Sequence, residues 1–149
     1  MQIWVDADAC PNVIKNILFR TAERLSVRLT MVANQPVKIP PSRYIKAIQV
    51  PAGFDAADNK IIQQVQAGDL VITADILLAD AIIKKDAYVL NHRSKFYTAD
   101  NIQQHLSMRH FLEELRTVGV DTGGPPPLSN ADRQAFANAL NCFLESAKN

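Results

Sequence analysis

The sequence predicts an α/β domain of the Rossmann-like, three-layer α/β/α kind, with a mainly parallel sheet of about five strands between two layers of helices. Short apolar runs, which suit strands buried on both faces, alternate along the chain with amphipathic helical patterns. The chain has 149 residues, of which 48% are hydrophobic and 21% charged, an ordinary globular composition. We therefore expect residues 1–149 to form a single domain.

The expected strands are short and apolar. They cover residues 3–5, 27–32, 45–50, 70–73 and 87–90. Strands that alternate with helices are joined by right-handed crossovers in a parallel sheet. The common order for such a sheet, 3-2-1-4-5, places the fourth strand beside the first.

The expected helices have recognisable ends. They cover residues 11–25, 55–68, a short segment after residue 75, 101–118 and 130–147. Pro11 suits a first helical position, Asp55 and Ser129 are suitable N-caps, and Gly68 and Gly119 are typical of helix ends. The helix at 101–118 is expected to bury a broad apolar face. Residues 93–98 read as a polar loop.

Acidic residues follow two of the expected strands. Asp6 and Asp8 come directly after the first strand and Asp75 after the fourth, while Asp58 lies in the first turn of the helix before the fourth strand. Strands one and four would be neighbours at the switch point of the sheet, where ligands bind in open α/β folds. We expect these carboxylates to share one opening.

Carboxylates crowded together need a cation, because like charges raise each other's pKa. Mg²⁺ or Mn²⁺ is the expected cofactor, and its chemistry at such a site is attack of water on a phosphate. The residues predict Asp6, Asp8, Asp58 and Asp75 as a candidate catalytic set. The alternative for each aspartate taken alone is a helix N-cap.

The charge balance predicts how a nucleic-acid partner would be held. A net charge of +1 and a pI near 7.8 provide no global positive field, so local clusters of cations would have to attract the nucleic acid. Arg93 and Lys95 stand with Tyr97 in a loop that mixes cations with aromatic rings, and Arg133 opens the last helix. We expect these residues to contact nucleic acid; ordinary solvated loops are the alternative.

Cysteine usage and hydropathy predict the compartment. Cys10 and Cys142 are far apart and lack metal-type spacing, no apolar leader precedes the first strand, and no apolar run is long enough to span a membrane. A reduced, cytoplasmic protein with no membrane partner is expected. The oligomeric state is left open.

Five motifs carry a resemblance that extends over nearly the whole chain. They are DADACP at 6–11, GFDAADNKI at 53–61, DLVITAD at 69–75, YTADNI at 97–102 and GGPPPLSNADRQAFANAL at 123–140. With these the chain resembles the bacterial YaiI/YqxD family of uncharacterised proteins, whose fold is similar to PIN-like nuclease domains. The resemblance implies a metal-dependent nuclease, with RNA a more probable substrate than DNA, whose metal ligands are Asp6, Asp58 and Asp75, with Asp8 as an added acid.

The chain departs from the family pattern at Leu77 and His92, where proline is more usual, and at Ser94, where glycine is more usual. These changes alter loop stiffness beside the expected site and remove no carboxylate. Two other functions stay open. One is a haloacid-dehalogenase-like phosphatase with Asp6 as nucleophile and Asp8 as acid, although Pro11 begins a helix early for that class. The other is a non-catalytic module that binds nucleic acid or a partner.

Overall fold

The computed structural model describes residues 1–53, 55–124 and 126–147. Its strands are β1 (Ile3–Asp6), β2 (Leu29–Ala33), β3 (Ile45–Gln49), β4 (Leu70–Ile72), β5 (Tyr88–Leu90) and β6 (Phe96–Tyr97). Its helices are α1 (Asn12–Leu25), α2 (Ala56–Gln64), α3 (Ile76–Ile83), α4 (Ile102–Thr117) and α5 (Asn130–Ala147), and the 3-10 turn η1 (Ala7–Ala9) follows β1. Phe54, Pro125 and the last two residues, which the motifs and the domain prediction include, lie outside the described residues.

The strands form one sheet in the order β3-β2-β1-β4-β5-β6. β1 pairs in parallel with both β2 and β4, in a register that places Ile3 beside Leu29 and Leu70. β6 pairs antiparallel with β5 at the edge. The α/β class with a mainly parallel sheet is confirmed, as is the adjacency of the first and fourth strands.

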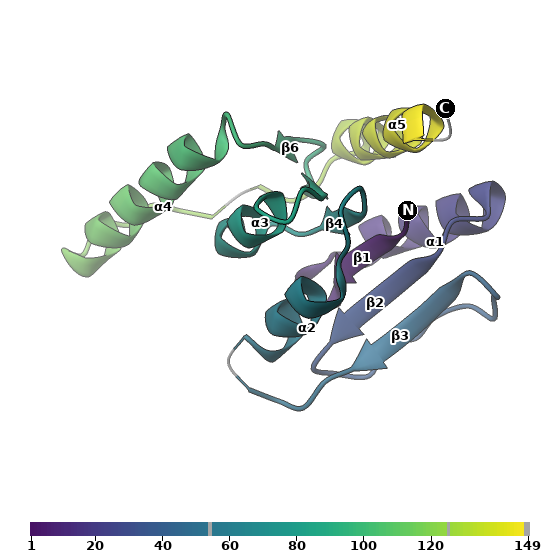
Figure 1. Cartoon of the computed structure of the whole chain (residues 1–149). Coiled ribbons are helices and arrows are strands. Elements are labelled where there is room, and N and C mark those ends of the chain that lie inside the picture. The colour runs from purple at the N-terminus through teal and green to yellow at the C-terminus, as the bar shows by residue number, and fades with distance from the viewer. Residues whose placement is uncertain (54, 125, 148–149) are drawn as a thin grey trace.

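Helices cover both faces of the sheet, so the fold has three layers (Figure 1). Alternation along β1 assigns its side chains to the two faces. Ile3 and Val5 pack with residues of α1 and α5, whereas Trp4 packs with residues of α2 and α3. Because both faces are covered at the centre of the sheet, β4 is buried and apolar throughout, whereas the edge strand β3 carries the exposed Lys46 and Gln49.

Four details differ from the sequence prediction. Phe96–Tyr97 is a strand rather than loop, because it closes a short hairpin with β5. The second strand begins at Leu29, two residues late, and α2 ends at Gln64, since Val65 is already extended. Asp55 occupies the N-cap position of α2 with a left-handed backbone (φ 62°) but makes no side-chain cap bond.

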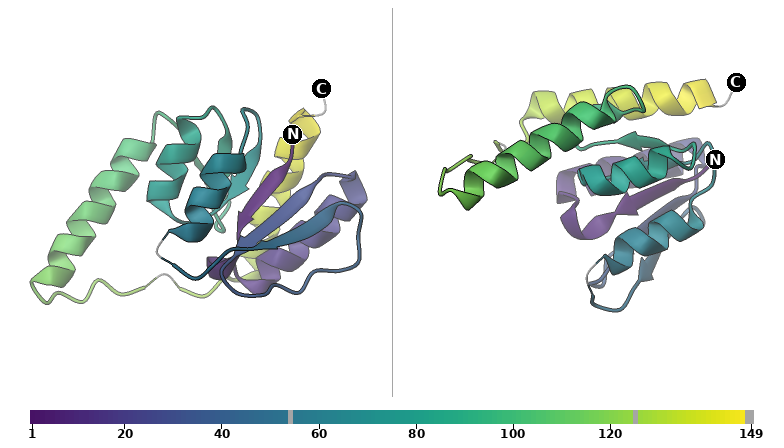
Figure 2. Two further views of the ribbon diagram at one scale, coloured as in Figure 1. Left: turned by 60° about the horizontal axis from the view of Figure 1, so that its bottom comes forward. Right: turned by 60° about the vertical axis from the view of Figure 1, so that its left-hand side comes forward.

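The largest difference is in α4, whose predicted apolar face is mostly uncovered. Only Ile102 is buried in this helix, while Met108 and Phe111 are each more than half exposed. α4 packs beside α3 and continues past the body of the domain before the chain returns to α5 (Figure 2). The helix does carry the predicted apolar side chains, but no described element covers most of them.

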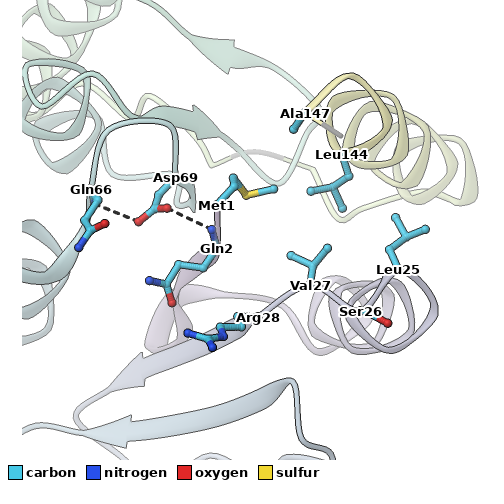
Figure 3. Close-up of a pocket in the computed structure, with 10 residues that line it drawn as sticks. All are labelled: Met1, Gln2, Leu25, Ser26, Val27, Arg28, Gln66, Asp69, Leu144 and Ala147. Atoms are coloured by element: carbon cyan, nitrogen blue, oxygen red, sulfur yellow. Dashed lines mark hydrogen bonds between the residues drawn. The ribbon is translucent and has the colours of Figure 1, made fainter. Parts of the chain in front are cut away.

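A buried acid closes the amino-terminal end of the sheet. Asp69 is 4% exposed and accepts three hydrogen bonds, from the backbone N–H of Gln2 (3.1 Å) and of Gln66 (2.9 Å) and from the indole N–H of Trp4 (3.1 Å). Asp69 lines a hollow of about 530 Å³, and Figure 3 shows it among the other residues that line this hollow. Since its oxygens are already bonded, Asp69 joins β1 to β4 and has a structural role. None of the helices described here is long and apolar enough to cross a bilayer.

Candidate active site at the carboxyl ends of β1 and β4

Two of the predicted acids lie at neighbouring strand ends. Asp6 is the last residue of β1, and Asp75 is the N-cap of α3, just after β4. Thr73 connects them: its hydroxyl donates to Asp6 Oδ2 (3.0 Å) and its Oγ1 accepts from the backbone N–H of Asp75 (3.0 Å). The strand pairing therefore positions both carboxylates at one edge.

Asp75 is held in place by the helix that it caps. Its Oδ1 accepts from the backbone N–H of Leu77 (2.9 Å) and of Leu78 (3.2 Å). Both donors belong to the first turn of α3, so one oxygen of the carboxylate is committed to the cap and its orientation is fixed. A proline at position 77 would lack the backbone N–H that Leu77 donates to this cap.

The third acid, Asp58, reaches the same place from the first turn of α2. The pKa of Asp58 is raised from 3.8 to about 6, mainly by burial and then by the negative charges of Asp6, Asp75 and Asp55. A hydrogen bond between the Asp58 and Asp75 side chains also favours the protonated form. Two carboxyl groups this close share a proton or a cation, because two bare negative charges repel.

Asp6 is the most deeply buried member of the set, at 9% exposed. Burial raises its pKa, the Thr73 hydroxyl partly opposes this, and the charges of Asp75 and Asp8 raise the pKa further. The structure therefore brings Asp6, Asp58 and Asp75 from three elements into one electrostatically coupled group, which we call the acidic cluster.

Asp8 lies at the margin of this cluster. It is exposed in η1, and its Oδ2 accepts from the backbone N–H of Asn34 (2.7 Å), just after β2. Asp8 is close enough for its charge to act on Asp6. Asn34 Oδ1 is buried without a hydrogen-bond partner among the described residues.

Sequence analysis missed Thr73 and Asn34. Thr73 is the polar residue that ends the apolar run LVIT two positions before Asp75, and that position was the available signal. Nothing in the sequence marks Asn34 as a site residue except its position just after the second strand. Asp80, one turn after Asp75 on α3, pairs with Lys84 (3.1 Å).

The donors of the acidic cluster fit a hard divalent cation, since Mg²⁺ and Mn²⁺ prefer carboxylate oxygens. As the side chains stand, no three His, Cys, Asp or Glu groups in the part of the chain that the structure describes are preassembled around a metal position. The Asp58 and Asp75 carboxyls nevertheless lie close enough for a hydrogen bond between them to favour the protonated form of Asp58. A cation would take the place of their shared proton.

The four residues predicted to contact nucleic acid have varied surroundings. Arg93 bonds to the carbonyl of Pro126 and pairs with Asp132 (3.5 Å), which ties the β5–β6 turn to the start of α5. Tyr97 is 7% exposed and packs edge-on against His105 (4.8 Å between ring centroids), so its ring is not open to a base.

The remaining two of these cations are exposed. Lys95 lies in the β5–β6 turn, at the same end of the sheet as the acidic cluster. Arg133 lines a hollow with Arg20, between α5 and α1 on the other face of the sheet from α2 and α3.

Comparison with known proteins assigns the chain to a family. The family described as "Uncharacterized BCR, YaiI/YqxD family" matches residues 4–146. The chain belongs to this family. Among its relatives, a UPF0178 protein of Janthinobacterium sp. (strain Marseille) is 65% identical over 97% of this chain and 95% of its own length. UPF0178 proteins of Herminiimonas arsenicoxydans and Shewanella amazonensis are 61% and 60% identical, each over 97% of both chains. No solved structure matches the chain.

Proposed function

We propose that this protein is a metal-dependent nuclease that hydrolyses phosphodiester bonds, in RNA rather than DNA, at the acidic cluster. The observation that carries the proposal is the convergence of Asp6, Asp58 and Asp75 from β1, α2 and the start of α3, with Asp58 hydrogen-bonded to Asp75. The pKa values of Asp6 and Asp58 are raised, and acids with raised pKa values at the carboxyl end of a parallel sheet are candidates for function. The resemblance of the sequence motifs to a family with a fold similar to PIN-like nuclease domains supports the same function.

The residues of the cluster have distinct roles in this proposal. Asp6, Asp58 and Asp75 would hold Mg²⁺ or Mn²⁺, which when bound would polarise a phosphodiester and assist attack by water. Thr73 orients Asp6 through its hydroxyl. The cap bonds of α3 orient Asp75 and leave its second oxygen for the site. Asp8 adds negative charge beside Asp6 and is the candidate for accepting a proton at the margin.

We infer a cytoplasmic setting from the thiols. Cys10 and Cys142 are both unpaired, and Cys10 is buried with its pKa raised to about 12 by burial. An inert buried thiol and an exposed single thiol suit a reducing compartment, where disulfides are rare.

The test is cleavage of labelled single-stranded RNA in Mg²⁺, Mn²⁺ or EDTA. We expect cleavage with either cation, none in EDTA, and a loss of at least about 100-fold in Asp75→Asn, because a carboxylate ligand is removed. Asparagine keeps the Oδ1 acceptor and is a good N-cap, so the fold should persist. Asp80→Asn, on the same helix but ion-paired with Lys84, is the matched control. Cleavage that is equal in Asp75→Asn, or that survives EDTA, would overturn the proposal.

A further inference from the structure

A groove of about 540 Å³ begins at the acidic cluster and is lined by the start of α3 and by α4. Its lining includes one member of the cluster and a second carboxylate, Glu113, together with cationic and apolar side chains. Asp75 is the member of the cluster, and Ile76, His105, Arg109, Leu112 and Arg116 also line the groove. None of the cations predicted from the sequence is among them.

The lining residues of α4 form one stripe. His105, Arg109, Leu112 and Arg116 follow at steps of four, three and four residues, the spacing of a single helix face. Arg109 and Arg116 are seven residues apart, which corresponds to about 10.5 Å along a helix axis. Successive stacked nucleotides of one strand rise about 3.4 Å, so that span matches about three nucleotides.

Both arginines have donors that an incoming phosphate could use. Arg109 pairs with Glu113 (2.9 Å) four residues along the helix, and Arg116 donates from Nε to the Thr122 hydroxyl (3.2 Å). An ion pair between exposed side chains one helical turn apart is weak, because water screens both charges. A guanidinium has five N–H donors, so each arginine can contact a phosphate at little cost.

The rest of the groove suits the other parts of a nucleotide. Ile76 and Leu112 offer apolar surface, and Met108, also in the lining, is 56% exposed. The ring of His105 is held edge-on against Tyr97. An exposed helix with apolar and cationic side chains on the face beside an acidic cluster is complementary to a polyanion with apolar bases.

We propose that this groove binds the backbone of single-stranded RNA and leads it to the acidic cluster, with Arg109 and Arg116 contacting phosphates. The inference rests on the proposed function, because it identifies the substrate path of the same site. It also gives a role to α4, which extends past the domain with most of its surface uncovered (Figure 2). Arg93 is a poorer candidate, since it is tied to Asp132 and Pro126.

The experiment measures the binding of a labelled single-stranded RNA to the full chain across a salt series, in Ca²⁺ to suppress turnover. The variants are Arg109→Gln with Arg116→Gln, and the charge-retaining Arg109→Lys with Arg116→Lys. A matched control, Arg20→Gln with Arg24→Gln, removes two exposed arginines from α1 on the other face. Thermal melts of each variant verify folding.

Losing two phosphate contacts should weaken binding and reduce the salt slope by about 1.4, at about 0.7 per contact for single strands. The lysine variant should keep most of the slope, and the α1 control should bind like the parent. Equal affinity and salt slope in the parent and the glutamine variant would overturn the proposal that the groove binds RNA. An equal loss of affinity in the α1 control would overturn it as well. If the parent binds no RNA, the groove is also wrong.

The cleavage assay separates this result from the proposed function. RNA cleavage by the parent with unchanged binding in the glutamine variant would leave the nuclease proposal intact and remove only the groove. RNA binding that depends on Arg109 and Arg116, in a protein that never cleaves RNA, would support the groove as the binding site and contradict the nuclease proposal.

Discussion

The two ends of the parallel sheet treat buried acids in opposite ways. At the amino-terminal end, Asp69 is surrounded by three N–H donors, which satisfy its charge and join β1 to β4. At the carboxyl end, Asp6 is nearly as buried, but its neighbours are the acids Asp58 and Asp75, and burial together with these negative charges raises the pKa of Asp6 and of Asp58. An acid that N–H donors surround stabilises a fold; acids that face one another need a proton or a cation.

The largest expected effect is at the amino-terminal end. Asp69→Ala leaves the indole N–H of Trp4 and two backbone N–H groups without their acceptor, so we expect the free energy of unfolding to fall by about 3 to 5 kcal/mol. Chemical denaturation measures this. Asp80→Ala, which removes a partly exposed acid and its pair with the exposed Lys84, should cost only about 0.3 to 0.5 kcal/mol. Similar losses in both variants would show that Asp69 contributes no more to stability than an ordinary ion-paired acid.

The opposite sign is expected at the carboxyl end. The pKa of Asp58 is raised from 3.8 to about 6, so the folded state binds the proton more tightly than the unfolded state. Stability from this group is present below pH 3.8 and is lost as pH rises through 6, because the unfolded chain then releases the proton more readily.

Asp58→Asn should therefore stabilise the metal-free protein by about 1 kcal/mol at neutral pH, a figure reduced because solvent screens this half-buried group. The gain should disappear as pH falls toward 3.8. Unfolding curves of parent and variant across this range measure it. A variant that is less stable than the parent at neutral pH would show that Asp58 is structural, as Asp69 is.

A smaller effect distinguishes backbone strain from charge at the carboxyl end. Ser94, in the β5–β6 turn, has φ 65°, a left-handed conformation that favours glycine. Ser94→Gly should add about 0.5 kcal/mol to the free energy of unfolding, since relief of about 1 kcal/mol is partly offset by glycine's entropy. Denaturation at several pH values tests it. A gain that varies with pH as that of Asp58→Asn does would place Ser94 within the electrostatics of the cluster.

The sequence predicted the sheet well because apolar runs and crossover rules constrain strand order. The same logic placed Asp6 and Asp75 at neighbouring strand ends. It did not predict that Thr73 would join them, or that Asp58 would bond to Asp75, because these depend on side-chain directions that spacing does not determine. The sequence pattern also predicted the apolar face of α4 but not that this face is exposed. Periodicity shows which side chains share a helix face, and it does not show whether another element covers that face.

The central claim is that the carboxyl end binds a divalent cation that Asp58, Asp75 and Asp6 share. The most direct measurement is calorimetric titration of Mn²⁺ into the metal-free parent, Asp58→Asn and Asp75→Asn at neutral pH, with Asp80→Asn as the matched control from α3. The parent and the control should bind one site with equal affinity, and the other two variants should lose it. In melts, a cation at about 100 times its Kd should add about 2.7 kcal/mol to the parent's stability. Absence of binding in the parent at millimolar Mn²⁺, or equal binding in all four proteins, would contradict the account.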